Sequence, residues 1–80
     1  MLITVHTFAQ LKDHFAPRFE VELEGGADVS ALIAALQKQE PDSGLLLQNC
    51  RMANEEEFVD KTYTLSDAAN IYFYPPSSGG

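Results

Sequence analysis

The residues best suited to chemistry lie in the segment YPPSSGG, residues 74–80. Pro75 and Pro76 lack backbone donors and have a restricted φ, so they end a preceding strand and stiffen the chain beyond it. The Gly80 α-carboxylate is sterically unhindered and ionised at neutral pH, so it is a poor electrophile until it is activated. We expect this segment to deliver its terminus into the active site of another protein. Four small residues give it a reach of at most ~14 Å when extended: Ser77, Ser78, Gly79 and Gly80.

The other reactive side chains do not suggest an active site within the domain. His6 and His14 fall on different predicted elements, and Cys50 is distant from both in sequence. A single cysteine forms neither an internal disulfide nor a zinc site by itself, so we expect Cys50 to be inert and not to carry sulfur. The acidic run 55–57 is typical of a solvated turn. We therefore predict no metal site and no self-contained active site.

Composition narrows the class of protein. The chain has 80 residues, enough for one small domain, and a formal net charge of −7 from 12 acidic and 5 basic residues. Such a surface repels phosphate backbones and anionic lipids, so we expect neither nucleic acid nor membrane partners. We find no apolar stretch of membrane-spanning length and no signal segment, so we expect a cytoplasmic location.

In the first half of the sequence, apolar and polar residues alternate as they do in half-buried strands. Residues 2–8 favour a strand with Ile3 and Val5 on one face, and residues 18–24 favour a second strand. The connection between them is short, a helix with Leu11 and Phe15 on one side that ends before Pro17, so the two strands are expected to be antiparallel. A helix is expected to follow, with Asp28 as its N-cap and apolar residues from Val29 at helical spacing.

The elements expected in the second half of the sequence are shorter. Pro41 and Gly44 are expected to end the main helix, and residues 50–54 and 57–61 favour a small hairpin. The last strand, residues 71–74, places Ile71 and Phe73 on one face. These elements predict an α+β domain over residues 1–74, with a mixed sheet of about five strands packed on one main helix. Parallel first and last strands at the centre would give the order 2-1-5-3-4 of a β-grasp roll, an order that periodicity alone does not establish.

The sequence resembles the small subunit of molybdopterin synthase, a member of the ubiquitin-like sulfur-carrier family. The resemblance covers essentially the whole chain and is carried by FAQLKDHF, DVSALIAAL and LSDAANIYFYPPSSGG. Ala68 and Ala69 stand where that family usually has Gly and Asp. Because alanine resists a positive φ, we expect this turn to adopt another geometry.

The resemblance implies a non-catalytic, sulfur-donating subunit. An adenylating and sulfurating enzyme, which itself binds ATP and Mg²⁺, would convert Gly80 to a thiocarboxylate, and this chain would bind no cofactor. The large synthase subunit would then bind the terminus, in a heterotetramer, and sulfur would pass to cyclic pyranopterin monophosphate. Three alternatives remain open: a sulfur carrier for thiazole synthesis, which the Pro-Pro pair disfavours, a modifier attached to target lysines, and a plain binding module with a frayed tail.

The resemblance also assigns an apolar contact surface to Phe8, Phe58 and Tyr74. Strand alternation independently predicts that Phe8 and Tyr74 point outward, because Val5 and Phe73 face the helix. It predicts the same for His6 and Tyr72. In parallel neighbouring strands, Phe8 and Tyr74 would lie at the same end, beside the tail at residues 75–80. The alternative is that these aromatic residues only support the sheet.

Overall fold

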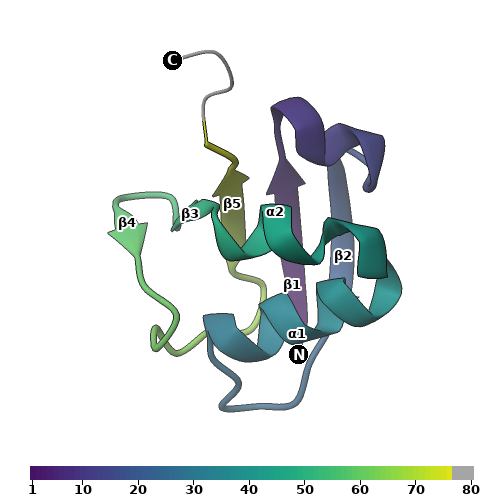
Figure 1. Cartoon of the computed structure of the whole chain (residues 1–80). Coiled ribbons are helices and arrows are strands. Elements are labelled where there is room, and N and C mark those ends of the chain that lie inside the picture. Colours follow the sequence, from purple (N-terminus) through teal and green to yellow (C-terminus); the bar gives the residue numbers. More distant parts are fainter. Residues whose placement is uncertain (77–80) are drawn as a thin grey trace.

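The computed structural model describes residues 1–76, and the predictions for Ser77, Ser78, Gly79 and Gly80 lie outside the described residues. Figure 1 shows the elements along the chain. The strands are β1 (Leu2–Thr7), β2 (Arg18–Glu22), β3 (Arg51–Ala53), β4 (Phe58–Val59) and β5 (Asn70–Tyr74). The helices are α1 (Val29–Gln39) and α2 (Gly44–Gln48), and the 3-10 turns are η1 (Ala9–Asp13) and η2 (Pro41–Ser43).

The five strands form one mixed sheet in the order β2-β1-β5-β3-β4. β1 is antiparallel to β2 and parallel to β5, while β3 is antiparallel to both β5 and β4. The predicted order, the antiparallel first pair and the small hairpin are therefore confirmed. The first and last strands of the domain lie side by side at its centre, as in a β-grasp roll.

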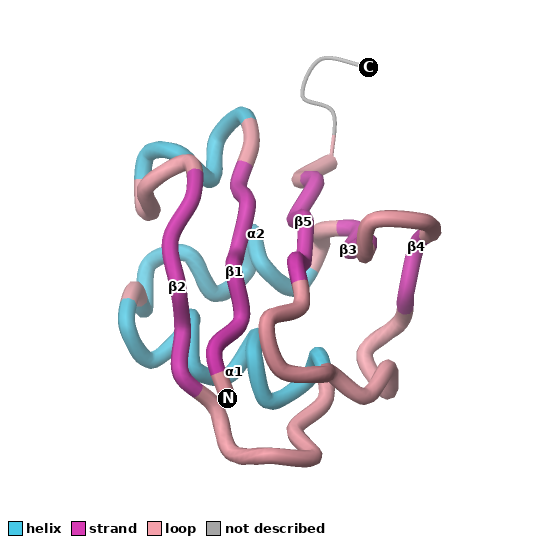
Figure 2. The backbone as a smooth tube through the Cα atoms, turned by 180° about the vertical axis from the view of Figure 1, so that it is seen from behind, coloured by secondary structure: helices cyan, strands magenta, loops and turns pink. Residues whose placement is uncertain are grey.

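The sheet and the helices form two layers. Figure 1 shows α1 and α2 in front of the sheet, with β1 and β5 running in the same direction behind them. Figure 2 shows the opposite face of the sheet, which no helix of the described residues covers. None of these helices is both long enough and apolar enough to cross a membrane. One face of the sheet is thus open to contacts with other molecules.

The core forms between the sheet and the helices. The inward residues of the two central strands have no exposed surface: Ile3, Val5, Ile71 and Phe73. The helix contributes Leu32 and Leu36, which are equally buried. The predicted alternation of the central strands is confirmed, and it leaves the intervening residues of β1 and β5 on the open face.

The main helix begins as predicted. Asp28 Oδ1 accepts a hydrogen bond of 3.0 Å from the Ala31 amide, which satisfies one of the unpaired N–H groups at the helix start. The helix ends at Gln39, but the prediction that Gly44 would help to end it is wrong. Gly44 has a helical φ of −53° and begins α2, a second helix that the sequence analysis did not predict. The burial of Leu47, which has no exposed surface, explains why this segment turns back onto the core.

The connection between β1 and β2 is a 3-10 turn, η1, rather than an α-helix. Its two apolar anchors behave as predicted, with Leu11 fully buried and Phe15 6% exposed. Thr7 fixes the far end of the connection, because its hydroxyl donates to the Ala16 carbonyl at 2.8 Å and its amide donates to the Pro17 carbonyl at 2.9 Å.

The turn before β5 contradicts the expectation that alanine would avoid a positive φ. Ala68 has a φ of 66°, in the left-handed region that costs a residue with a Cβ about 1–2 kcal/mol. Two hydrogen bonds tie this turn to the start of β1: the Ala68 amide donates to the Leu2 carbonyl at 2.9 Å, and the Leu2 amide donates to Asp67 Oδ1 at 3.0 Å. The turn keeps a glycine-like geometry because these contacts fix it.

Candidate functional site: an aromatic docking surface at the end of β5

Three exposed aromatic side chains meet on the open face of the sheet, and we call them the aromatic surface: Phe8, Phe58 and Tyr74. The rings of Phe8 and Tyr74 are stacked, with centroids 4.9 Å apart and an interplanar angle of 5°. The Phe58 ring meets Tyr74 edge-on at 6.2 Å. Their exposed fractions are 39%, 55% and 39%. The structure thus brings together the three residues that the sequence analysis assigned to a contact surface.

Strand register explains this meeting. In the parallel pair of β1 and β5, Thr7 lies opposite Phe73, so the residues that follow, Phe8 and Tyr74, are neighbours on the opposite face. On the other side of β5, Arg51 of β3 lies opposite Tyr74. β3 then pairs with β4 and places Phe58 at the same end of the sheet. Four strands therefore position one surface.

Arg51 belongs to this surface, although the sequence analysis did not select it. Its guanidinium carbon lies 4.0 Å from the centroid of the Phe58 ring, a cation–π contact. The signal for it was present in the sequence, because Met52 is an inward residue of β3 and its neighbour must then point outward. Arg51 holds one face of the exposed Phe58 ring and adds a positive charge to the rim.

An acidic loop borders the aromatic surface. A hollow of about 350 Å³ is lined by Tyr74, Phe58, Ala53 and the loop residues 54–57. Asn54 fixes this loop, because its Oδ1 accepts hydrogen bonds of 2.8 Å from the amides of Glu56 and Glu57. The acidic run is the turn that the sequence analysis expected, and it places carboxylates next to the apolar contact area.

A second pair of rings lies one step further along the same two strands. His6 and Tyr72 are stacked with centroids 4.2 Å apart and an interplanar angle of 15°. His6 Nε2 lies 2.9 Å from Asn70 Oδ1, and Asn70 Nδ2 donates to Glu55 Oε1 at 3.3 Å. Sequence reasoning placed His6 on the outward face but did not predict this network, which joins β1 and β5 to the acidic loop.

The remaining reactive groups are separate from this surface. Cys50 is 8% exposed, and its thiol donates to the Leu46 carbonyl at 3.3 Å. Burial raises the pKa of this thiol from 9.0 to about 11, so it is neutral and unreactive near neutral pH. His14 lies at the end of η1 and contacts Phe15 rather than His6. Within residues 1–76, no three His, Cys, Asp or Glu side chains are grouped so as to hold a metal ion.

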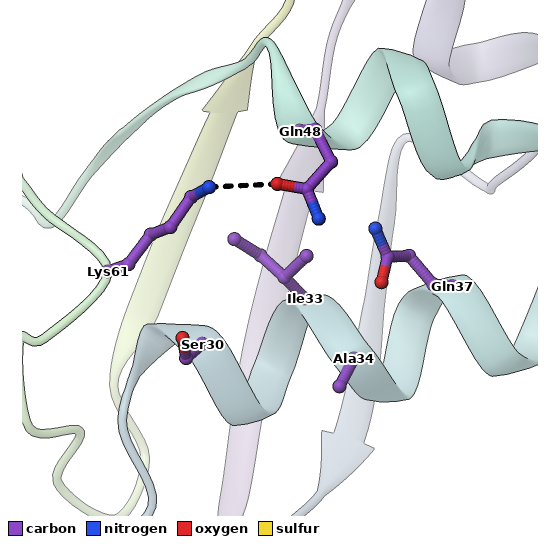
Figure 3. A pocket seen from close by; sticks show the side chains of 6 residues that line it. All are labelled: Ser30, Ile33, Ala34, Gln37, Gln48 and Lys61. Carbon is purple, nitrogen blue, oxygen red and sulfur yellow. Dashed lines mark hydrogen bonds between the residues drawn. The ribbon is translucent and has the colours of Figure 1, made fainter.

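A smaller hollow, of about 230 Å³, lies on the helical side of the sheet. Figure 3 shows its lining, with the Lys61 ammonium directed at the Gln48 side chain. Lys61 Nζ donates to Gln48 Oε1 at 2.8 Å, and Gln37 Nε2 donates to the Gly44 carbonyl at 3.3 Å. The long polar side chains of the lining thus have hydrogen-bond partners within the domain, and none of the lining residues belongs to the aromatic surface. We assign no function to this hollow.

The start of the tail lies beside the aromatic surface. Tyr74 ends β5, and Pro75 and Pro76 follow it directly as the last described residues. Whatever docks on the aromatic surface is therefore adjacent to the start of the segment that leads to Gly80.

The strand order, the two layers and the helix-free sheet face define a ubiquitin-like β-grasp protein. The chain belongs to the ThiS family, which it matches over residues 5–80. No curated protein matches the chain at the level of sequence.

Solved structures share this fold over nearly the whole chain. A candidate molybdopterin converting factor subunit 1 from Pyrococcus furiosus has a TM-score of 0.86 at 21% identity and covers 96% of this chain and 99% of its own. SAMP1 from Haloferax volcanii has a TM-score of 0.82 at 21% identity, with both chains fully covered. The third structure is a complex of subunits 1 and 2 of the molybdopterin-converting factor from Helicobacter pylori. One chain of this complex has a TM-score of 0.73 at 27% identity, again with full coverage of both chains.

Proposed function

We propose that this chain is the sulfur-carrier subunit of a molybdopterin synthase, with Gly80 as its reactive terminus. The observation that carries the proposal is the position of the aromatic surface at the end of β5, where the chain leaves the sheet as Tyr74-Pro75-Pro76. A partner that binds these rings is held next to the tail. The likeness to molybdopterin-converting factor structures supports the same function.

The proposed chemistry uses only the terminal carboxylate of this chain. A Gly80 oxygen attacks the α-phosphorus of ATP in the adenylating enzyme, and pyrophosphate leaves. A sulfur nucleophile then attacks the activated carbonyl carbon and displaces AMP, which leaves a thiocarboxylate. Glycine suits this role because it has no side chain to block a narrow active site. ATP and Mg²⁺ bind to the partner, and we place the cycle in the cytoplasm.

The proposed partners share the aromatic surface in turn. The Helicobacter pylori structure is a complex of subunits 1 and 2, and we propose that this chain likewise binds a large subunit, in a heterotetramer. The adenylating and sulfurating enzyme is the second partner. Exposed aromatic residues that lose their water on binding supply most of the affinity of such interfaces, while the rim supplies little. The acidic loop favours partners whose rim is basic.

Intact-mass analysis tests the proposal. The full-length chain is incubated with the adenylating enzyme, ATP, Mg²⁺ and a sulfur source, and then with the large subunit and cyclic pyranopterin monophosphate. We expect a mass gain equal to the exchange of one oxygen for sulfur, which is lost only when both later components are present. A chain that gains sulfur but discharges it only into thiazole synthesis would assign it to the thiamine branch.

Protein modification is a second candidate, favoured by the likeness to SAMP1, the small archaeal modifier protein 1, across the full length of both chains. Such a modifier would form amide-linked conjugates with target lysines that survive denaturation. Recovery of these conjugates without any transfer of sulfur to the pyranopterin would refute the proposed function in favour of protein modification.

A further inference from the structure

The orientation of the Asn70 amide fixes the hydrogen-bonding state of His6. Glu55 Oε1 is a carboxylate oxygen and only accepts, so the Asn70 nitrogen faces it at 3.3 Å. Asn70 Oδ1 then faces His6 Nε2 at 2.9 Å. An amide oxygen only accepts, so Nε2 must carry the proton. In the neutral ring the other nitrogen, Nδ1, therefore has a lone pair that can accept a hydrogen bond.

Nδ1 has no hydrogen-bond partner among residues 1–76, whereas the rest of the ring is held in place. Tyr72 stacks on its face, and Asn70 binds Nε2. His6 is partly exposed, and strand alternation places it on the face of the sheet opposite Val5. The acceptor is therefore presented in a fixed orientation and does not depend on a freely rotating side chain.

His6 lies close enough to the aromatic surface for one partner to cover both. His6 is two residues before Phe8, which directly follows β1 in an extended conformation, and Tyr72 is two residues before Tyr74 on β5. Each separation is about 7 Å along the chain. A standard protein interface buries about 800 Å² on each partner, a patch roughly 30 Å across. A partner centred on the stacked rings of Phe8 and Tyr74 thus extends over His6.

We propose that His6 is a specificity-determining contact of the docking surface, whose Nδ1 accepts a hydrogen bond from an N–H group of the large subunit, the partner that the Helicobacter pylori complex supports. The proposal rests on the proposed function, since it assumes that the partner of the tail binds on the aromatic surface. Arg18 lies opposite His6 on β2, so a neutral amide donor fits better than a lysine ammonium. A protein that covers Nδ1 without offering a donor leaves an acceptor unsatisfied, so it binds more weakly than a protein that offers one.

Two substitutions separate this role from a structural one. His6→Asn places an amide near the position of Nδ1 and loses the contact of Nε2 with Asn70. His6→Gln places its amide near Nε2, keeps that contact and loses the acceptor at Nδ1. If His6 only supports the sheet, the glutamine variant is the milder change. If Nδ1 contacts the partner, the asparagine variant binds more tightly than the glutamine variant.

Titration calorimetry with the purified large subunit and the purified adenylating enzyme measures the affinities of the two variants. We expect His6→Gln to weaken binding to the large subunit about three- to tenfold, and His6→Asn to remain within about twofold of the wild type. Thermal unfolding of both variants shows that they are folded, and long-range ¹H–¹⁵N spectra of the wild type check the Nε2–H tautomer.

Equal affinities for the two variants, or the reverse order, would refute the role of Nδ1 and leave the proposed function intact. An Nδ1–H tautomer in the free wild-type protein would also refute it. If the wild type binds neither partner and gains no sulfur, both proposals fail.

Discussion

Phe8 and Tyr74, which follow the first strand and end the last, stack with their ring planes only 5° apart, yet each remains 39% exposed to solvent. An aromatic pair that only braced a sheet would gain more by being covered, because burial of apolar area supplies most of the stabilisation. Exposed, mutually ordered rings present a rigid surface that loses little conformational entropy on binding. This relationship motivates the first prediction.

We predict that Phe8→Ala or Tyr74→Ala weakens binding to the adenylating enzyme and to the large subunit by at least about 1–2 kcal/mol. The free energy of unfolding should fall by less than about 1 kcal/mol, because the truncated rings are exposed. Titration calorimetry and thermal unfolding measure the two effects. Leu45→Ala is the matched control, since Leu45 is 79% exposed but lies on α2, and it should leave both affinities unchanged. Unaltered affinity in both aromatic variants would return these residues to a structural role.

Deletion of Gly80, or addition of one residue after it, should abolish thiocarboxylation. The reason is that adenylation requires an unhindered carboxylate at a fixed reach from Pro75 and Pro76. Intact-mass analysis after incubation with the adenylating enzyme detects the loss, and a circular dichroism spectrum like that of the wild type shows an unchanged fold. An extended chain that accepts sulfur without being trimmed would disprove the assignment of Gly80.

Ala68→Gly should stabilise the protein by about 0.5–1 kcal/mol. Glycine removes the steric cost of the φ of 66° but adds conformational entropy to the unfolded chain, so the net gain is smaller than the strain. Urea denaturation gives the free energy of unfolding. Ala69→Gly is the control, because Ala69 packs against the core and is not at a positive φ, so its loss should destabilise. If both variants were destabilised, the strain at Ala68 would be negligible.

The sequence predicted those features that depend on local periodicity. Alternation alone identified the inward residues Ile3, Val5, Ile71 and Phe73, because a side-chain period of two leaves little choice once one face is apolar. The strand order needed the resemblance as well, since periodicity says nothing about which strands pair.

The features that the sequence analysis predicted wrongly or missed depend on tertiary contacts. Gly44 begins a helix because Leu47 is drawn into the core, a contact that its glycine signal does not reveal. The network of His6, Asn70 and Glu55 joins distant segments, and it exists only because the parallel pairing brings β5 beside β1. Sequence reasoning could place His6 on a face but not choose its partner.

Cys50 gives a prediction for the pH dependence of stability. Its pKa is raised from 9.0 to about 11 because burial disfavours the thiolate. The resulting contribution to stability is therefore fully present below pH 9 and is lost as the pH rises toward 11. The free energy of unfolding of the wild type should fall more steeply between pH 9 and 11 than that of Cys50→Ser. Other groups titrate alike in both proteins, so parallel curves would contradict the burial effect.

Cys50→Ser should also retain sulfur transfer, because the thiol is buried and neutral when the enzymes act. The same intact-mass assay applies, and iodoacetamide should label Cys50 slowly in the native protein at pH 8 and rapidly in urea. A well-folded Cys50→Ser protein that fails to accept sulfur would show that this thiol takes part in the reaction.

The central pairing of β1 with β5 has a consequence for biosynthesis. The hairpin of β1 and β2 leaves the ribosome first, but a two-stranded hairpin is only marginally stable by itself. Ile3 and Val5 stay unprotected until Ile71 and Phe73 are translated and β5 is added beside β1. Long-range pairing of this kind makes closure of the sheet a late event. A prematurely terminated polypeptide therefore lacks the stacked rings of Phe8 and Tyr74, and it is a substrate for proteolysis before it can compete with finished chains for the proposed partners.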